Sequence, residues 1–447
     1  SRQLWLGHRI PVYTCENGHR FASVEEPDRC PTCGSTRLTA DRDVLDTWFS
    51  SALWPFATLG WPDDTPELRK FYPTALDSTA RDILTLWVSR MIFSGLEFTG
   101  QVPFADVMIH ATIQAADGRR MSKSLGTGVD PRQLIRTYGA DALRAWATQV
   151  AMTGQDARYD ESRIEGYRRF ANKLWNATRL VAGWLPEGPA PALPPRQRLS
   201  LADRWILSRL QEVVAEVPAR IEDFTFTGSI TSLYDFCWHD LCDWYLESAK
   251  SRLRGGDATA RAVAVHVLDV AFRLLHPFMP FLTEDLWHRL PGERDFLVRS
   301  EWPEVQDGAR DAAAEARVAR AIGATEEVRR LRKRAGAKPR GGRAWLGERV
   351  DGEVASLIVE WAQIELAEGA APAGALPLTA LDGQVELAAV QQDAPSIEQE
   401  RGRLLKELER VAGKLANRAF VDRAPEAVVA KERARREEIL QALTRLG

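Results

Sequence analysis

The spacing of apolar residues changes along this chain, and the first 160 residues show a mixed pattern. The short run Val107-Met108-Ile109 predicts a strand, whereas Ile83 to Phe93 and Ala140 to Val150 have helical spacing. Strands that alternate with helices are typical of an α/β fold. Residues 1–40 read as short strands and turns. We therefore expect a connecting segment over residues 1–40 and an α/β domain over residues 41–160.

From residue 161 onward, the apolar spacing predicts helices. Tyr167, Phe170 and Leu174 fall on one helical face. A proline-rich break over residues 185–195 precedes two long amphipathic stretches, near residues 200–252 and 258–290. The prolines between His276 and Pro280 end or kink the second stretch. This pattern predicts a helical bundle over residues 161–304.

Two further segments complete the chain. Residues 305–395 are rich in Ala and Gly, with short strand signals at Ala355 to Val359 and Val385 to Leu387, and they predict a small mixed α/β module. In residues 396–447, two apolar stripes flank a break at residues 417–425. The stripes are Leu404, Leu408, Val411 and Leu415, then Val428, Ile439, Leu443 and Leu446. They predict an antiparallel helical hairpin of the coiled-coil kind.

The composition is that of an ordinary protein with several globular domains. The 447 residues are 45% hydrophobic and 27% charged, with a net charge of −3. No apolar run approaches the roughly 18 residues that a membrane span needs, and the first residues lack the apolar core of a signal peptide. We therefore expect a cytoplasmic protein without a membrane partner. Because Met is absent from position 1, we also expect the chain to begin inside a longer protein.

Three of the five cysteines cluster near the start of the chain. Cys15-x3-His19 and Cys30-x2-Cys33 offer three thiolates and one imidazole, which suits a tetrahedral structural Zn²⁺ site. The alternative is a set of free thiols beside a surface histidine. Cys237 and Cys242 lie in a predicted helix and are expected to be buried core thiols. An odd number of cysteines, three of them clustered, favours a reducing compartment over disulfide bonding.

A basic, hydroxyl-rich loop at Gly118 to Gly126 carries the strongest chemical signal. Its centre, Arg120-Met121-Ser122-Lys123-Ser124, resembles the KMSKS signature of the class I aminoacyl-tRNA synthetases, with Arg120 in place of the first Lys. In that family, a carboxylate attacks the α-phosphate of ATP, and negative charge develops on the departing pyrophosphate. A cation and small hydroxyl groups in a mobile loop can stabilise that charge. The alternative is an ordinary basic surface loop.

Further strings resemble the valyl group of this family and occur in the family's order. Asp43 to Pro55 resembles the valyl version of the active-site strand, and Phe170 to Ala177 resembles the first helix of the anticodon-binding domain. Asp46 to Ser51 argues against the isoleucyl group, which is the second choice. The resemblance implies the C-terminal half of a valyl-tRNA synthetase. Part of a Rossmann-type catalytic domain would be followed by a helical anticodon-binding bundle and a coiled-coil tRNA-binding arm.

The resemblance also implies roles for individual residues. Arg120, Ser122, Lys123 and Ser124 would be catalytic. ATP, with Mg²⁺, would be bound by His110, Met121 and Lys123, and L-valine by Asp46, Trp48, Asp82 and Ile83. The family usually has Gly where this chain has Ala80 and Ala111. Without the resemblance, Trp48 is more simply a core residue.

The function implied is ligation of L-valine to valine tRNA through valyl-adenylate, a step of protein biosynthesis. The sequence holds neither the family's His-x-Gly-His motif nor its inserted editing domain. We therefore expect the N-terminal half of the same enzyme as a partner, and no activity from this segment alone. The alternative from another class is a non-catalytic tRNA-binding protein derived from a synthetase.

Two sets of residues would face the tRNA under either hypothesis. Trp238, Tyr245 and Trp287 could stack on bases, although packing is the more frequent use of such residues. The terminal hairpin is basic before its second helix and would lean on the tRNA body, the alternative being a solvated charged face. Its basic residues are Arg401, Arg403, Lys406, Arg410, Lys414, Arg418 and Arg423.

Overall fold

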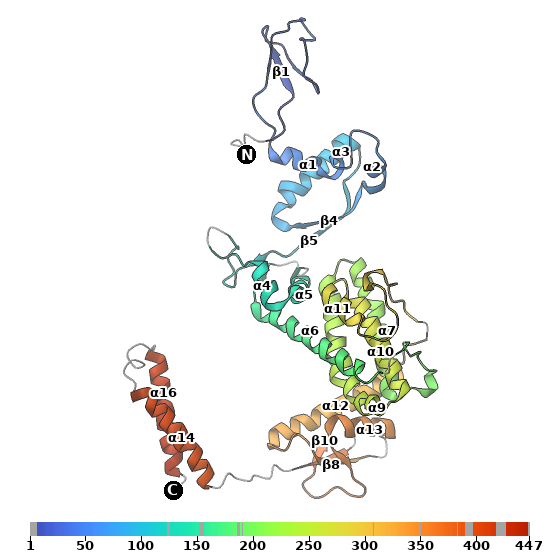
Figure 1. Cartoon of the computed structure of the whole chain (residues 1–447), viewed down its shortest axis with the longest axis vertical. Helices are drawn as coiled ribbons and strands as arrows, with labels where there is room; N and C mark the ends of the chain where they lie inside the picture. Colours follow the sequence, from blue (N-terminus) through green and yellow to red (C-terminus); the bar gives the residue numbers. More distant parts are fainter. Residues whose placement is uncertain are drawn as a thin grey trace. The chain divides into compact units, whose positions relative to one another are not determined.

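The computed structural model divides into two compact units, Ser1–Ala316 and Arg317–Gly447. Figure 1 follows the chain from its blue N-terminal end to its red C-terminal end. The structure describes residues 7–122, 126–151, 156–185, 188–189, 191–306, 308–347, 350–381, 383–388, 397–416 and 426–445. No helix within these ranges is long and apolar enough to cross a membrane.

A small antiparallel sheet forms the predicted connecting segment. Its strand order is β2–β1–β3, with β1 at Val12–Cys15, β2 at Arg20–Ala22 and β3 at Leu38–Ala40. Gly18, with φ of +81°, allows the tight turn in which the Cys15 N–H donates to His19 O at 3.0 Å. A second turn is closed by Gly34 N–H donating to Cys30 O at 2.9 Å. The two turns therefore carry all four predicted metal ligands.

The following part is α/β, as predicted. Strands β4 (Thr74–Ala80) and β5 (Phe104–His110) pair in parallel, and the short strands β6 (Ile113–Gln114) and β7 (Ala157–Arg158) form a second parallel pair. The crossover from β4 to β5 runs through η1 (Arg81–Ile83), the π-helical η2 (Leu84–Val88) and α3 (Ser89–Thr99). The other helices are α1 (Thr47–Ala57), α2 (Pro66–Phe71), α4 (Pro131–Tyr138) and α5 (Ala140–Ala151). Val88, Met91 and Phe104 form the buried cluster between the crossover and the strands.

The predicted active-site strand over Asp43 to Pro55 is wrong for most of its length, because residues 47–57 form α1. Asp46 caps this helix by accepting a hydrogen bond from Trp48 N at 2.8 Å. Ala52, Pro55 and Phe56 are its buried residues, and their spacing of three and four positions suits a helix. Only an isolated bridge between Arg9 and Val44 is strand-like in this region.

The predicted helical bundle is confirmed. Its helices are α6 (Glu161–Ala182), α7 (Leu201–Glu222), α8 (Phe226–Asp235), the π-helical η4 (Phe236–Tyr245), α9 (Leu246–Arg254), α10 (Ala258–Leu275) and α11 (Pro280–Trp287). A short 3₁₀ turn, η3 (Arg196–Arg198), lies between α6 and α7, and a second, η5 (Leu297–Arg299), follows α11. As predicted, α10 stops before the prolines, and Pro280 occupies the first turn of α11, where its missing N–H is tolerated.

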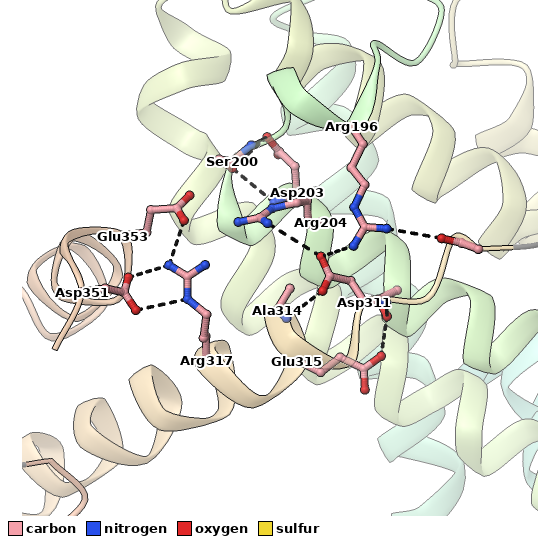
Figure 2. Close-up of polar contacts among 12 residues, drawn as sticks. Arg196, Ser200, Asp203, Arg204, Asp311, Ala314, Glu315, Arg317, Asp351 and Glu353 are labelled. Carbon is pink, nitrogen blue, oxygen red and sulfur yellow. Dashed lines mark hydrogen bonds and ion pairs between the residues drawn. The ribbon is translucent and has the colours of Figure 1, made fainter. Parts of the chain in front are cut away.

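Buried carboxylates hold this bundle together at specific points. Asp203 on α7 is fully buried and accepts hydrogen bonds from Tyr245 Oη at 2.9 Å and from Arg252 Nη2 at 2.9 Å. Figure 2 shows a second buried carboxylate, Asp311, which pairs with Arg196 at 2.7 Å and caps the following helix through Ala314 N. Buried charges of this kind are tolerated only when they are paired.

The α/β part and the bundle are joined through α5. Its buried carboxylate, Asp141, accepts hydrogen bonds from Phe281 N at 3.3 Å and Leu282 N at 2.5 Å in the first turn of α11. One turn later, Arg144 donates to Pro277 O at 2.9 Å. These side chains therefore fix the turn between α10 and α11 against α5.

The predicted α/β module lies in the second unit. Its four-stranded sheet has the order β10–β11–β8–β9, with β8 at Gly342–Leu346, β9 at Glu365–Leu366, β10 at Leu376–Leu378 and β11 at Gly383–Leu387. Helix α12 (Ala312–Ala335) precedes β8, and α13 (Gly352–Ala362) follows it. The strand expected at Val385 to Leu387 is confirmed in β11.

The strand expected at Ala355 to Val359 is wrong, because this segment belongs to α13. Val354, Leu357, Ile358 and Trp361 are buried at helical spacing. Asp351 caps the helix by accepting from Val354 N, and it also pairs with Arg317 at 2.6 Å (Figure 2). A short run of apolar residues could not distinguish a buried strand from a helix.

The terminal segment is a helical hairpin of α14 (Ile397–Ala416) and α16 (Glu426–Arg445). Leu404, Val411 and Ile439 form its buried cluster, with Leu408, Leu415 and Leu443 packed against it. Two ion pairs cross between the helices, Lys414 with Glu432 at 2.7 Å and Arg435 with Glu407 at 3.1 Å. Their crossed numbering makes the helices antiparallel, as predicted. The expected break at residues 417–425 lies outside the described residues.

Candidate active site and metal centre

The carboxyl ends of β4 and β5 bring several of the predicted substrate-binding residues together. The register pairs Ala80 with His110, and the chain then enters η1, which contains Asp82 and Ile83. In open α/β sheets, ligands bind at this edge of parallel strands. Ala80 has extended backbone, with φ of −87°, so its β-carbon introduces no backbone strain here. The edge therefore places an exposed carboxylate beside a half-buried imidazole.

The base of the KMSKS-like loop reaches the same edge. Gly118, with φ of +84°, makes the turn that lets Arg120 bridge back to Gln114. The guanidinium of Arg120 lies 3.4 Å from the carboxylate of Asp82, and both side chains are exposed. An exposed pair of this kind contributes little to stability, so it remains available to ligands. Arg120, which the resemblance implies is catalytic, therefore lies next to Asp82, which the resemblance implies binds L-valine.

The two sides of the loop are held by a threonine. Ser122 N donates to Thr127 Oγ1 at 3.0 Å, and Thr127 N donates to Ser122 O at 3.3 Å. Met121 is half-buried. The predicted catalytic residues Lys123 and Ser124 lie outside the described residues. Hydrogen bonds between Ser122 and Thr127 therefore hold the two ends of the loop together.

A carboxylate that the sequence did not single out supports this edge. Asp156 accepts from Arg81 Nη2 at 3.1 Å and from Gln114 Nε2 at 2.9 Å. It thereby ties the residue before Asp82 to the strand before the loop. No residue pattern in the sequence pointed to this role.

Trp48 and Asp46 begin α1, and their observed contacts are structural. Asp46 is the N-cap of the helix. The guanidinium of Arg90 on α3 lies 5.5 Å from the ring of the half-buried Trp48, within the range of a cation–π interaction. A role in valine binding for these two residues remains a prediction.

A cavity of about 590 Å³ lies nearer the amino end of β4, and no sequence pattern indicated it. Trp54, Lys70, Phe71 and Trp87 line it together with Asp77. Burial raises the pKa of the Asp77 carboxyl, and its Oδ2 has no hydrogen-bond partner among the described residues. A carboxyl group in apolar surroundings favours its neutral form.

The four predicted metal ligands converge. The ligand atoms of Cys15, His19, Cys30 and Cys33 all lie within 4.8 Å of one another. Cys15 Sγ is 3.5 Å from His19 Nδ1 and 3.7 Å from Cys33 Sγ, and Cys30 Sγ is 3.9 Å from the same Nδ1. All five cysteines of the chain are free of disulfides. The cluster is therefore a candidate metal centre with three sulfur donors and one nitrogen donor.

A neighbouring side chain supports one of the thiolates. Asn17 Nδ2 donates to Cys33 Sγ at 3.3 Å. This hydrogen bond, followed by one from the Ser35 backbone, lowers the pKa of Cys33 to about 6. Asn17 supports a candidate ligand without being one itself, and the sequence interpretation missed it, although it lies inside the Cys15-x3-His19 turn.

The remaining aromatic and cysteine candidates are packed in the bundle. Tyr245 is fully buried, and Trp287 is 5% exposed with the Arg294 guanidinium 4.1 Å from its ring. Trp238 is half-buried, stacked on Tyr234 at 5.5 Å. Cys237 and Cys242 are buried core thiols, as predicted, and burial raises the pKa of Cys242 to about 12. Packing therefore accounts for Tyr245 and Trp287.

The basic residues of the hairpin fall into two groups. Lys406 and Arg410 are exposed, whereas Lys414 is engaged with Glu432 across the hairpin. Arg418 and Arg423 lie outside the described residues, and the side chains of Arg401 and Arg403 are not described either. Lys414 therefore has a structural partner that the sequence did not indicate.

Three family models match this chain, in sequence order. They are "tRNA synthetases class I (I, L, M and V)" over residues 1–160, "Anticodon-binding domain of tRNA ligase" over residues 203–342 and "Valyl tRNA synthetase tRNA binding arm" over residues 394–446. The chain therefore belongs to the class I tRNA synthetases. The solved agnB2 LeuRS of Agrobacterium radiobacter K84, in a ternary complex with tRNA and LeuAMS, shares the fold. Its TM-score is 0.58 at 20% identity, over 69% of this chain and 42% of that one.

Curated valine–tRNA ligases match nearly the whole chain. The valine–tRNA ligase of Carboxydothermus hydrogenoformans is 44% identical over 97% of this chain and 51% of that protein. The valine–tRNA ligase of Thermotoga maritima is 40% identical over 100% of this chain and 53% of that protein. The chain thus spans about half the length of the curated relatives it matches.

Proposed function

We propose that this chain is the tRNA-facing portion of a valine–tRNA ligase, which joins L-valine to valine tRNA through valyl-adenylate. The observation that carries the proposal is the pairing of Arg120 with Asp82 at the carboxyl edge of β4 and β5. It puts the base of the KMSKS-like loop beside the position at which an open α/β sheet binds its ligand. The family match supports the reaction class.

Each residue at this edge has a proposed task. Lys123, with Ser122, Ser124 and Arg120, stabilises the charge that develops on the departing pyrophosphate when the valine carboxylate attacks the α-phosphate of ATP. His110 and Met121 line the nucleotide, which binds with Mg²⁺. Asp82 and Ile83, with Asp46 and Trp48 from the start of α1, hold L-valine. Five free cysteines suit the reducing cytoplasm, where we place this reaction.

The N-terminal half of the same enzyme is the proposed partner of the α/β part. Large apolar side chains are exposed there, on the helices at Trp54 (63%) and Phe93 (74%) and on the sheet at Val107 (38%) and Ile109 (40%) of β5. Parallel sheets are normally covered on both faces, so this surface fits a further layer of polypeptide. We therefore expect residues 1–447 alone to form no valyl-adenylate, because only part of the stabilising geometry is present.

The test is ATP–pyrophosphate exchange with valine. Residues 1–447 should give no exchange, and addition of the N-terminal half, joined or in trans, should restore it. Exchange with isoleucine instead of valine would identify the isoleucyl branch. No exchange in the reconstituted enzyme would favour a non-catalytic tRNA-binding protein, whereas robust exchange by residues 1–447 alone would contradict the proposed partner.

We further propose that Cys15, His19, Cys30 and Cys33 hold one structural Zn²⁺ ion. A tetrahedral site with Zn–S bonds of about 2.3 Å has S···S edges of about 3.8 Å and S···N edges of about 3.5 Å. The observed 3.7 Å between Cys15 and Cys33, and 3.5 Å between Cys15 and His19, fit these edges. A set with four protein donors suits a structural site rather than a catalytic one.

Elemental analysis of the purified chain should find about one zinc ion per molecule. The His19→Ala variant should lose most of the zinc and lower the thermal stability of the connecting segment. Cys237→Ala, which changes a thiol far from the cluster in sequence, is the control and should retain the metal. Metal-free protein prepared without chelators would contradict the site.

A further inference from the structure

One carboxylate lies between two segments to which the proposed function gives separate tasks. Asp156 accepts a hydrogen bond from Arg81 Nη2 at 3.1 Å through one oxygen and from Gln114 Nε2 at 2.9 Å through the other. Arg81 immediately precedes Asp82 in η1, and Gln114 is the last residue of β6, on the way into the KMSKS-like loop. A single side chain therefore bridges the valine-binding turn and the strand that leads into the loop.

Strand pairing fixes the backbone beside this carboxylate. Strand β7 begins directly after Asp156 and pairs in parallel with β6. Ala157 N donates to Thr112 O at 3.0 Å, and Tyr159 N donates to Gln114 O at 2.8 Å. The Asp156 side chain therefore extends from an anchored segment, which can hold its two partners in place.

Gln114 belongs to the same hairpin as Arg120. The two residues form an isolated antiparallel bridge, and Ala115 N donates to Arg119 O at 2.8 Å. The turn between them is closed by Gly118 N, which donates to Ala115 O at 2.8 Å. A side chain that fixes Gln114 therefore also fixes the position of Arg120.

Together these contacts close a ring. The Arg120 guanidinium lies 3.4 Å from the Asp82 carboxylate, and Asp82 is joined to Arg81 by the peptide chain. Asp156 then connects Arg81 back to Gln114, which is bridged to Arg120. The Arg120–Asp82 pair is exposed and can be displaced by a charged ligand. The bonds of Asp156 would still hold the two sides of the ring together after that displacement.

Stability alone gives little reason for this bridge. The side chains of Arg81 and Asp156 are 60% and 30% exposed, and ion pairs this accessible to water contribute little to folding. A fixed separation between two ligand-binding segments matters far more to a reaction, because its rate depends steeply on how the reacting groups are placed.

We propose that Asp156 is a positioning residue that fixes the separation between the turn at Asp82 and the base of the KMSKS-like loop at Arg120. The tasks of these two segments rest on the proposed function. Asp156 acts through Arg81 and Gln114 and not on the substrates themselves. It keeps the bound valine and the charge that develops on pyrophosphate in one geometry while the Arg120–Asp82 pair opens.

The kinetic test uses ATP–pyrophosphate exchange by the reconstituted enzyme. Asp156→Ala should lower kcat by roughly 10- to 100-fold, the size of effect that a small misplacement of reacting groups produces. The KM values for valine and ATP should each change by less than about threefold, because the proposed ligand-binding groups remain. Asp156→Asn keeps one acceptor oxygen and should lose less activity than Asp156→Ala.

Two controls separate positioning from a general loss of charge. The double variant Arg81→Ala with Asp156→Ala should lose no more activity than Asp156→Ala alone, because both changes break the same link. Asp64→Ala removes the carboxylate of another exposed pair in the α/β part, with Arg69 at 2.7 Å, and should exchange at the wild-type rate. Additive losses in the double variant, an equal loss in Asp64→Ala, or a raised KM at unchanged kcat would overturn the proposal.

A second measurement does not depend on catalysis. Hydrogen exchange of the 447-residue chain, followed by mass spectrometry, reports on both segments. Leu84 N–H is bonded to Arg81 O in η1, and Ala115 N–H is bonded to Arg119 O in the hairpin. Asp156→Ala should speed the exchange of the peptides that contain these two amides, whereas Asp64→Ala should speed neither. Faster exchange in only one peptide, or in neither, would overturn the bridge.

Failure of the proposed function gives a different result. Absence of pyrophosphate exchange in the wild-type reconstituted enzyme would count against the proposed ligase. Hydrogen exchange would then still decide whether Asp156 links the two segments. Normal exchange kinetics in Asp156→Ala, with an active wild-type enzyme, would overturn the positioning role alone.

Discussion

The α/β part and the helical bundle belong to the same compact unit, yet they bury their apolar residues to different degrees. In the bundle, Phe170, Leu174 and Ile206 are completely buried. In the α/β part, Phe93 is 74% exposed, Trp54 is 63% exposed, and the outer residues of β5 remain accessible. The bundle therefore has a complete core of its own, whereas the α/β part has apolar surface in excess of what its own helices cover.

The two parts also differ in how they use charged residues. The bundle places carboxylates such as Asp203 inside, each fixed by several donors. The α/β part keeps Asp82 and Arg120 exposed and weakly paired. Fixed, buried pairs define a structure, whereas exposed pairs can exchange partners when a charged ligand arrives. Within this unit, fixed buried pairs therefore occur in the bundle, whereas the Asp82–Arg120 pair of the α/β part is free to exchange partners.

The largest effect is expected from Asp203→Ala, which should lower the free energy of unfolding by about 3–5 kcal/mol. Removal of this carboxylate leaves Tyr245 Oη and the Arg252 guanidinium without their buried acceptor. Urea unfolding followed by tryptophan fluorescence measures the change. Asp82→Ala is the control in the α/β part and should be indistinguishable from wild type in stability. Similar losses of unfolding free energy in the two variants would contradict this difference between the bundle and the α/β part.

The next effect concerns catalysis rather than stability. In the reconstituted enzyme, Lys123→Ala should raise the activation barrier for adenylate formation by about 3 kcal/mol, a loss of roughly 150-fold. Arg120→Ala should lose less, since Arg already replaces the family's usual Lys at that position. Both variants should unfold like wild type. Pyrophosphate exchange at the wild-type rate in Lys123→Ala would contradict the role of this loop.

A smaller effect should appear on acidification, and it should come from the bundle. Burial lowers the pKa of His266 below its ordinary value of 6.5, so the unfolded chain binds a proton more readily than the folded one. The stability contributed by neutral His266 is therefore complete above pH 6.5 and is lost as the pH falls through and below that value. The slope for one proton is at most about 1.4 kcal/mol per pH unit.

The measurement compares wild type with His266→Gln by urea unfolding between about pH 7.5 and pH 5.5, a range that spans the ordinary pKa of histidine. The stability difference between them should shrink as the pH falls, because only wild type acquires the buried charge. His8→Gln, at an exposed position, serves as the matched control. A constant difference across this range would show that protonation of His266 is not coupled to folding.

The smallest effect on the chain alone is expected from Trp54→Ser in the α/β part. This side chain is 63% exposed, so the free energy of unfolding should change by less than about 0.5 kcal/mol. Capture of the N-terminal half should nevertheless weaken, which a pull-down titration would measure. Substitution of the exposed Phe281 by Ser in the bundle should leave that capture unchanged. Equal capture by all three proteins would remove Trp54 from the proposed interface.

The sequence predicted elements well where a periodic pattern was long. The helices of the bundle and the hairpin follow from spacing sustained over many residues, as in α6 and α10. The pattern failed at Ala355 to Val359, where a short run of residues suits either a strand or a helix. It failed again at Asp43 to Pro55, where the resemblance suggested a strand but the Asp46 cap begins a helix. Local capping decided the outcome in that segment.

The candidate site was predictable only as far as residue types and spacing reach. The two turns between short strands brought Cys15, His19, Cys30 and Cys33 together, as their spacing indicated. Asp156 and Asp77 were not predictable, because their roles depend on strand pairing and on the shape of a cavity. Asn17 was overlooked because no rule for ligand spacing includes the donors that support a thiolate.

The bonds from α5 to the turn after α10 bear on how this protein can be recombined. The boundary between catalytic and anticodon-binding parts looks, in sequence, like a place at which related enzymes could exchange halves. Asp141 and Arg144 lie before that boundary, yet their partners Phe281, Leu282 and Pro277 lie more than a hundred residues after it. A chimaera joined at residue 160 would take α5 from one enzyme and its partners in the bundle from another, so these hydrogen bonds would have to form between the two. An exchange that keeps these bonds would therefore have to transfer α5 along with the bundle.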